Sequence, residues 1–162
     1  MKKRNKVIFL CTGNICRSPI GEALLKDAIE KDGDVQLKSL KVMSAGTSTV
    51  DGMSASAHSV EALRRIDVDL SGHRSTMLTQ QLVDEAFAIF ALAQSHIDIL
   101  QTYYDNLPPR VLTVLDAVEG CPRRDVPDPY GGTLDDYLDV RDNIAYAIPS
   151  IVEYLKNELK KA

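Results

Sequence analysis

Two patterns of apolar and polar residues alternate along this chain. Short, continuous apolar runs predict four strands buried on both faces, near residues 7–11, 40–45, 86–93 and 110–115. Apolar positions at helical spacing predict helices near residues 17–32, 56–66 and 95–104, and a long final helix that begins at Thr133. Strands that alternate with helices in this way are typical of a parallel sheet covered by helices.

Several residues predict how these helices begin and how they pack. Thr133 and Asp136 are spaced as a capping box, and Ser95 is positioned to cap its own helix. Pro149 lies inside the final helix and is expected to kink or split it. Gly21 weakens the first helix by up to about 1 kcal/mol relative to alanine. This cost indicates that the backbone packs closely on the sheet at this point.

Composition limits the class of protein. With 162 residues and 44% hydrophobic content, the chain can bury one substantial core, and the sequence predicts a single domain over residues 1–162. The net charge of −4 gives no reason to expect nucleic acid or a membrane as partner. The apolar run after the basic N-terminus is too short for a secretion signal, and no run approaches a membrane span. Three cysteines, an odd number, fit a reducing cytoplasm.

The main candidate for chemistry is the loop after the first predicted strand. Cys11 and Arg17 are separated by five residues, a length that can wrap one tetrahedral anion with its backbone N–H groups. Arg17 adds a bidentate cationic clamp. The N–H groups, the start of the next helix and the arginine all favour a thiolate at Cys11, to which Ser18 can donate a hydrogen bond. The predicted phosphate-binding loop consists of Cys11, Thr12, Gly13, Asn14, Ile15, Cys16, Arg17 and Ser18.

Other interpretations of this loop fit less well. If Cys11 and Cys16 were only small core residues, the joint occurrence of strand, cysteine, arginine, hydroxyl and helix start would be unexplained. A Walker-type loop needs a Gly-Lys-Ser or Gly-Lys-Thr sequence, which does not follow. A zinc site needs a second pair of ligands, whereas Cys121 and the histidines are scattered, so we expect no metal.

Cleavage of a phosphate ester by a cysteine also needs a proton for the leaving oxygen. Asp128 is the candidate acid. It lies in residues 126–132, where two prolines stiffen the chain and two glycines let it turn. By composition alone, an aspartate between prolines is more typical of an ordinary turn.

Four motifs together resemble the low-molecular-weight protein-tyrosine phosphatases. They are CTGNICRSP at residues 11–19, SAGT at 44–47, DLSGHR at 69–74 and DPYGG at 128–132. The resemblance covers nearly the whole chain. It implies an α/β fold, a flavodoxin-like three-layer sandwich with a four-stranded parallel sheet of order 2-1-3-4. The active site of such a sheet is expected at the carboxyl end of the first strand.

The resemblance implies hydrolysis of phosphotyrosine in two steps, without a cofactor. Cys11 attacks phosphorus while Asp128 protonates the departing phenolate, and Asp128 then activates the water that hydrolyses the phosphocysteine. Arg17 and the loop N–H groups hold the phosphate oxygens throughout. Inorganic phosphate is the product.

The resemblance also implies supporting roles for further residues. The network that keeps the loop rigid in this family is matched by Asn14, Ser18, Ser44 and His73. From the residues alone, without the family resemblance, Ser44 is interpreted as an ordinary strand-end serine. His73 is interpreted as a surface or helix-capping residue. Cys16 is implied to form a reversible disulfide with Cys11, which shelters the nucleophile from further oxidation. Cys121 has no such partner in the sequence.

Substrate choice is expected to depend on the rim of the loop. Ile15 can pack on an aryl ring, whereas the related bacterial arginine phosphatases carry threonine there, so protein-arginine phosphatase is the alternative function. Tyr130 is placed to form an aromatic wall beside the acid. Many family members have Trp or Tyr in the next part of the rim, where this chain has Thr49 and Val50. Gly131 follows Tyr130, so the tyrosine pair of the animal enzymes is absent.

Two other classes of protein share parts of this pattern. A thioredoxin-coupled arsenate reductase needs two more cysteines as relay thiols, and beyond the loop the chain has only Cys121. A non-catalytic phosphoprotein-binding module tolerates loss of Cys11 or Asp128, and both are present. The expected partner is therefore a tyrosine-phosphorylated protein; bacterial relatives often oppose tyrosine kinases of capsule or exopolysaccharide export. We expect a monomer or a weak homodimer.

Overall fold

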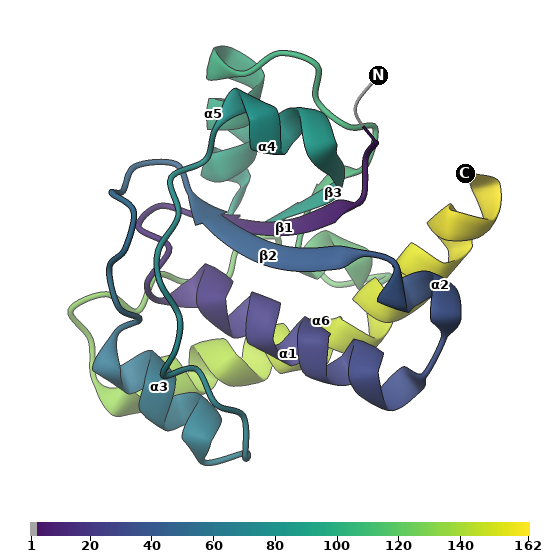
Figure 1. Ribbon diagram of the computed structural model, residues 1–162. Coiled ribbons are helices and arrows are strands. Elements are labelled where there is room, and N and C mark those ends of the chain that lie inside the picture. The colour runs from purple at the N-terminus through teal and green to yellow at the C-terminus, as the bar shows by residue number, and fades with distance from the viewer. Residues whose placement is uncertain (1–2) are drawn as a thin grey trace.

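The computed structural model describes residues 3–162, which form an α/β structure (Figure 1). The elements follow in the order β1 (Lys6–Cys11), α1 (Arg17–Asp32), α2 (Val35–Lys38), β2 (Lys41–Gly46), α3 (Ala57–Arg64), α4 (Gln80–Glu85), β3 (Ala86–Ala91), α5 (Gln94–Tyr103), β4 (Val111–Thr113), the 3-10 turn η1 (Leu115–Ala117) and α6 (Leu134–Lys161). All strand pairs are parallel and the strand order is β2-β1-β3-β4. The predicted sheet is confirmed.

Helices cover both faces of this sheet. Figure 1 shows α1, α3 and α6 on one face and α4 and α5 on the other. After β1 the chain crosses to the face of α1, whereas after β3 it crosses to the face of α5. The result is the flavodoxin-like three-layer sandwich that the sequence predicts.

Each face of the sheet has a hydrophobic core of its own. Strand β1 contributes to both, because its successive side chains point to opposite faces. Phe9 lies in the core beneath α1 and α6, where its ring stacks on Phe90 with centroids 5.7 Å apart. Ile8 and Leu10 lie in the core on the other face. Cys11 shares the face of Phe9 and ends the strand. The strand therefore directs the cysteine toward the start of α1.

Gly21 explains how closely α1 lies on the sheet. A Cβ atom added at Gly21 would be 2.5 Å from the ring of Phe9, which is completely buried. Any larger residue would push the helix away from β1. The expected close packing of backbone on sheet is therefore confirmed.

Several boundaries differ from the predictions. The helices α2 and α4 were not predicted, because helices of four and six residues are too short to show a helical period. The third and fourth strands end earlier than predicted, at Ala91 and at Thr113. The chain then leaves the sheet to form the loops at its carboxyl edge.

Some helix ends and interiors also differ from those that the sequence predicts. Ser95 is not a cap, because α5 already begins at Gln94 and its N-cap is Ala93. The capping box of Thr133 and Asp136 is confirmed. The helix is not split at Pro149, since α6 continues to Lys161. Pro149 is exposed, and buried residues before and after it hold the helix against α1 and α3.

Candidate active site

The loop between β1 and α1 surrounds the sulfur of Cys11. The Sγ atom lies 2.8 Å from the hydroxyl oxygen of Ser18 and accepts a hydrogen bond from the backbone N–H of Asn14 at 3.3 Å. The side-chain amide of Asn14 donates to the same Ser18 oxygen at 2.8 Å. That bond occupies a lone pair of Ser18 and leaves its hydrogen free to point at the sulfur. The arrangement stabilises a negative charge on Sγ.

Asn14 fixes the shape of this loop. It is completely buried and has a positive φ of 56°, a conformation that asparagine tolerates better than most residues. Its side-chain oxygen accepts from the N–H of Thr76 at 2.8 Å, and its carbonyl oxygen lies 2.7 Å from Nε2 of His73. The structure therefore brings His73 to the loop, as the resemblance implies.

The segment after β2 holds the loop from another side. The N–H groups of Thr47 and Ser48 donate to the carbonyls of Cys11 and Thr12, at 2.9 and 3.0 Å. A Cβ atom at Gly46 would be 2.6 Å from the Thr12 carbonyl oxygen, so only glycine fits here without a shift. Gly46 belongs to the SAGT motif, but the motif alone does not indicate this role.

Ser44, by contrast, lies outside the network predicted for it. Its hydroxyl donates to the carboxylate of Glu22 on α1 at 2.6 Å, not to the loop. Ser44 pairs with Phe9 in the middle of the sheet, two residues before the end of β1. The hydroxyl therefore links β2 to α1 and does not contact the phosphate-binding loop.

Arg17 connects the loop to the segment that carries the candidate acid. The side chain is 5% exposed, and its Nη1 donates to the carbonyl of Val126 at 3.1 Å. Its Nη2 lies 3.7 Å from a carboxylate oxygen of Asp128. The contact with the Val126 carbonyl could not be foreseen, because any residue offers a carbonyl.

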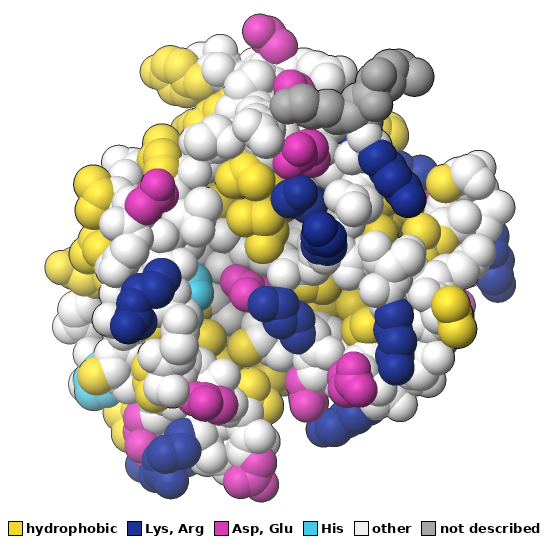
Figure 2. Space-filling view, in the orientation of Figure 1, with side chains coloured by type: hydrophobic (Ala, Val, Ile, Leu, Met, Phe, Trp, Pro, Cys, Tyr) yellow, Lys and Arg dark blue, Asp and Glu magenta, His cyan; other side chains and the backbone are white. Residues whose placement is uncertain are grey.

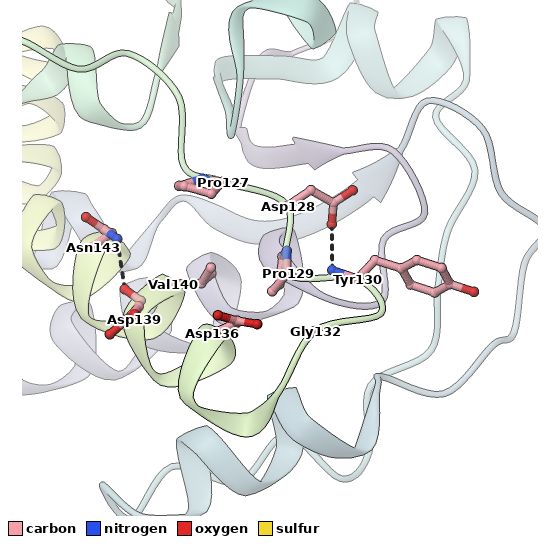
Figure 3. Close-up of a pocket in the computed structure, with 9 residues that line it drawn as sticks. All are labelled: Pro127, Asp128, Pro129, Tyr130, Gly132, Asp136, Asp139, Val140 and Asn143. Carbon is pink, nitrogen blue, oxygen red and sulfur yellow. Dashed lines mark hydrogen bonds between the residues drawn. The ribbon is translucent and has the colours of Figure 1, made fainter.

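Asp128 and Tyr130 lie on the loop before α6. The Asp128 carboxylate is 55% exposed and accepts the Tyr130 N–H at 3.1 Å. Figure 3 shows the Tyr130 ring pointing away from α6, while a hollow of about 350 Å³ lies on the side of Asp136 and Val140. The segment of Asp128 and Tyr130 thus lies between two hollows, one on the side of Cys11 and one on the side of α6.

One cavity gathers the three candidate catalytic side chains. It has a volume of about 230 Å³ and is lined by Cys11, Thr12, Gly13, Ile15, Cys16, Arg17, Asp128 and Tyr130. Thr49 and Val50 are not part of this lining. The Thr49 hydroxyl donates instead to the carbonyl of Val50, whose side chain is 65% exposed. Thr49 and Val50, which the sequence places at the rim by the family resemblance, therefore do not line this cavity.

Comparison with known proteins identifies this arrangement. The family model described as low molecular weight phosphotyrosine protein phosphatase matches residues 6–161. The chain belongs to this family. It is 34% identical to a protein-arginine-phosphatase of Bacillus subtilis (strain 168), over 94% of this chain and 97% of that protein. It is 30% identical to the low molecular weight protein-tyrosine-phosphatase Etp of Escherichia coli (strain K12), over 82% of each.

Solved structures of this phosphatase family agree with the fold. A mutant of the YwlE arginine phosphatase, with a phosphorylated active-site serine, has a TM-score of 0.84 at 34% identity and covers 93% of this chain and 95% of its own. A low molecular weight protein tyrosine phosphatase from T. tengcongensis has a TM-score of 0.83 at 30% identity, and the match covers 92% of this chain and 98% of that chain. Of these relatives, those named for arginine match at 34% identity and those named for tyrosine at 30%, and the structures of both kinds have the same fold as this chain. The predicted family and enzyme class are confirmed.

Cys16 is a second buried thiol in the catalytic cavity of this phosphatase. Its Sγ lies 3.4 Å from the hydroxyl of Tyr137, and burial raises its pKa. Cys16 is therefore held as the neutral thiol. Cys121 is only half-buried and contacts the carbonyl of Arg123. It does not line the catalytic cavity.

His96 also contacts the phosphate-binding loop, although no motif marks it in the sequence. It is 2% exposed, and its Nε2 lies 3.1 Å from the hydroxyl of Thr12. Burial and the positive charge of Arg17 lower the pKa of His96 to about 4. The ring is therefore neutral at pH 7 and adds no charge behind the loop.

This buried histidine predicts a pH dependence of stability. Its ordinary pKa is 6.5, so between pH 6.5 and pH 4 the unfolded chain binds a proton that the native protein does not. The stability that neutral His96 contributes is present above pH 6.5 and is lost as the pH falls toward 4. From pH 7 to pH 4, the free energy of unfolding should fall by about 3 kcal/mol more in the wild type than in His96→Gln.

Urea unfolding of both proteins at several pH values measures this difference. His58→Gln, at an exposed histidine, is the control and should keep the wild-type pH dependence. The same pH dependence in wild type and His96→Gln would contradict the assignment.

Charge and metal-binding groups on the described residues mark no further site. Basic and acidic side chains are interspersed on the face in Figure 2, without one large basic patch. Among the residues that the structure describes, no three His, Cys, Asp or Glu side chains are grouped to hold a metal ion. None of the helices between residues 3 and 162 has the length and apolar character needed to cross a lipid bilayer.

Proposed function

We propose that residues 1–162 act as one catalytic domain that hydrolyses phosphotyrosine in proteins through a phosphocysteine intermediate. The observation that carries this proposal is the shared cavity of Cys11, Arg17 and Asp128. Ile15 and Tyr130 line the same cavity and offer an apolar and an aromatic surface to an aryl ring.

In the first step, the Cys11 thiolate attacks phosphorus and the bond between phosphorus and the phenolic oxygen breaks. Asp128 gives its proton to that oxygen, so tyrosine leaves as the neutral phenol. The Arg17 guanidinium and the N–H groups of residues 12–17 bind the three equatorial oxygens. The Ser18 hydroxyl, oriented by Asn14, stabilises the thiolate before attack.

In the second step, water replaces the cysteine on phosphorus. The ionised Asp128 takes a proton from the attacking water, and the sulfur leaves as a thiolate that Ser18 and the Asn14 N–H again stabilise. The YwlE structure with a phosphorylated active-site serine supports a covalent phosphoenzyme of this kind.

Protein-arginine phosphatase is the second candidate. It is supported by the 34% identity with the arginine phosphatase of B. subtilis over almost the whole of both chains. Ile15 favours phosphotyrosine, because its apolar side chain can pack on an aryl ring but gives no hydrogen bond to a phosphorylated guanidinium.

Phosphate release from a phosphotyrosine peptide and a phosphoarginine peptide, measured side by side without added metal, tests the proposal. Cys11→Ser serves as the blank. We expect turnover of phosphotyrosine that the blank lacks. Preference for phosphoarginine would establish the second candidate, and no release from either peptide would overturn both.

Ile15→Thr tests the origin of the substrate preference. The threonine hydroxyl adds a polar partner for a guanidinium and removes apolar contact with an aryl ring, so kcat/KM for phosphotyrosine should fall roughly tenfold relative to phosphoarginine. Ile15→Val keeps the apolar surface and is the matched control. An unchanged ratio in Ile15→Thr would show that other parts of the rim select the substrate.

The same cavity supports a redox extension of the proposal. A peroxide oxidises the Cys11 thiolate to the sulfenic acid, and the Cys16 thiol then displaces water from that sulfur to form a disulfide. Three free thiols suit a reducing cytoplasm, where the disulfide can be reduced again. On the family resemblance, the proposed protein substrate is a tyrosine kinase of capsule or exopolysaccharide export. The proposed oligomeric state is a monomer or a weak homodimer.

A further inference from the structure

A second cavity borders the catalytic one. Its volume is about 380 Å³, and its lining includes Thr12, Ser48, Met77, Ile99, Tyr103 and Tyr104. Thr12 lines both cavities, and its side chain is exposed. The two hollows are therefore neighbours that share one residue of the phosphate-binding loop. We call the second one the Tyr103 cavity.

The Tyr103 cavity lies where sheets of this type have a natural crevice. Thr12 follows β1 and Ser48 follows β2, whereas Tyr103 belongs to α5, which follows β3. The chain leaves β1 toward one face of the sheet and β3 toward the other (Figure 1). At such a switch point the two connections diverge, and they leave a space outside the carboxyl ends of the strands in which ligands bind.

The lining of the Tyr103 cavity indicates what kind of group it takes. No Asp, Glu, Lys or Arg side chain is part of the lining, in contrast to the catalytic cavity with Arg17 and Asp128. The apolar and aromatic lining residues are Met77, Ile99, Tyr103 and Tyr104, and the polar ones are Thr12, Thr47, Ser48, Ser95 and His96. The Tyr103 side chain is exposed, with a relative accessibility of 76%. An exposed aromatic ring beside a hollow of this size is typical of sites that receive an apolar group.

A polar atom in the wall has no partner within the protein. The buried hydroxyl of Thr47, another lining residue, makes no hydrogen bond among the residues described. An unpaired buried hydroxyl is a cost to the folded protein. Nδ1 of His96, which also lines the cavity, is a second buried polar atom without a partner in the described part of the chain. The surface of the site is thus mainly apolar, with unused hydrogen-bonding capacity at two buried atoms.

We propose that the Tyr103 cavity binds the substrate side chain that neighbours the phosphorylated residue, and that it prefers an apolar or aromatic side chain. This inference rests on the proposed function. Continuity with the catalytic cavity through Thr12 decides the occupant, because the neighbours of a phosphorylated residue bound in the catalytic cavity lie at the rim of that cavity, and Thr12 is part of both linings. Binding there adds substrate recognition that a small aryl phosphate cannot use.

Matched phosphopeptides test this proposal. They carry the phosphorylated residue that the protein hydrolyses, flanked on one side or the other by alanine, phenylalanine or glutamate. For the wild type we expect kcat/KM to be roughly fivefold higher with phenylalanine than with alanine on the favoured side, and lower with glutamate. Turnover of p-nitrophenyl phosphate, which has no neighbouring side chain, normalises each preparation.

Two exposed tyrosines allow a matched pair of variants. Tyr103→Ala removes a wall of the cavity. The ratio of kcat/KM for the phenylalanine peptide to kcat/KM for the alanine peptide should therefore fall toward one. Tyr146→Ala makes the same change on α6, where the tyrosine is 65% exposed and lines another hollow, and should keep the preference. Ser48→Glu, at an exposed rim position, should disfavour the glutamate peptide further.

Equal kcat/KM values for alanine and phenylalanine peptides in the wild type would overturn the proposal. A phenylalanine preference that survives Tyr103→Ala, or a glutamate peptide that Ser48→Glu does not disfavour further, would overturn it as well. No Cys11-dependent release from any peptide would instead overturn the proposed function, and the role of this cavity with it.

Discussion

Replacing Cys11 with serine is expected to lower phosphate release from a phosphotyrosine peptide by about 10⁴-fold or more. The reason is the state of the attacking atom. The Ser18 hydroxyl and the Asn14 N–H stabilise a sulfur anion, but these two hydrogen bonds are far too weak to ionise a serine hydroxyl at neutral pH. The phosphate cradle itself should stay intact, because serine is close to cysteine in size.

Two measurements separate loss of chemistry from loss of structure. Inorganic phosphate should still raise the melting temperature of Cys11→Ser, since Arg17 and the loop N–H groups remain. Cys121→Ser is the matched control, because Cys121 is half-buried and lies outside the catalytic cavity, and it should keep wild-type turnover. Substantial turnover by Cys11→Ser, or an equal loss in Cys121→Ser, would contradict the assignment of Cys11 as nucleophile.

Asp128→Asn should lower turnover of phosphotyrosine by about 10²- to 10³-fold. An amide in this position can neither protonate the phenolic oxygen nor take a proton from water. The loss should be smaller for p-nitrophenyl phosphate, whose leaving group departs readily without a proton. The leaving-group dependence therefore separates a general acid from a residue that only shapes the loop.

Asp139→Asn is the matched control for Asp128. Asp139 lines the hollow on the α6 side of the acid loop, so the change removes the same charge nearby without touching the catalytic cavity. Turnover by this variant should match the wild type. Equal losses for both substrates in Asp128→Asn would indicate a structural role for Asp128 and would contradict its assignment as the acid.

The features predicted from the sequence are those in which neighbouring residues decide the structure. The apolar run before Cys11, the five-residue spacing to Arg17 and the helix start after it specify a strand, a loop and a helix in immediate succession. The strand order followed from the family resemblance and the alternation of elements. Gly21 could be interpreted because a glycine inside a helix has few explanations other than close packing.

The features that were missed depend on contacts between distant segments. His96 reaches Thr12 across 84 positions, and Val126 reaches Arg17 across 109. Neither residue has a local pattern that indicates its role. Ser44 was assigned to the wrong network because a motif gives a position but not the direction of a hydroxyl, which here points to Glu22.

The left-handed conformation of Asn14 has a consequence for the turnover cycle. A flexible loop would have to be ordered around each incoming phosphate, and the entropy lost would weaken every binding event. Here the contacts of Asn14 with Ser18, His73 and Thr76 order the loop while the chain folds. The loop is then already ordered when the substrate arrives, with the Asn14 N–H directed at the sulfur of Cys11. The entropic penalty therefore falls on folding, once, and not on each catalytic cycle.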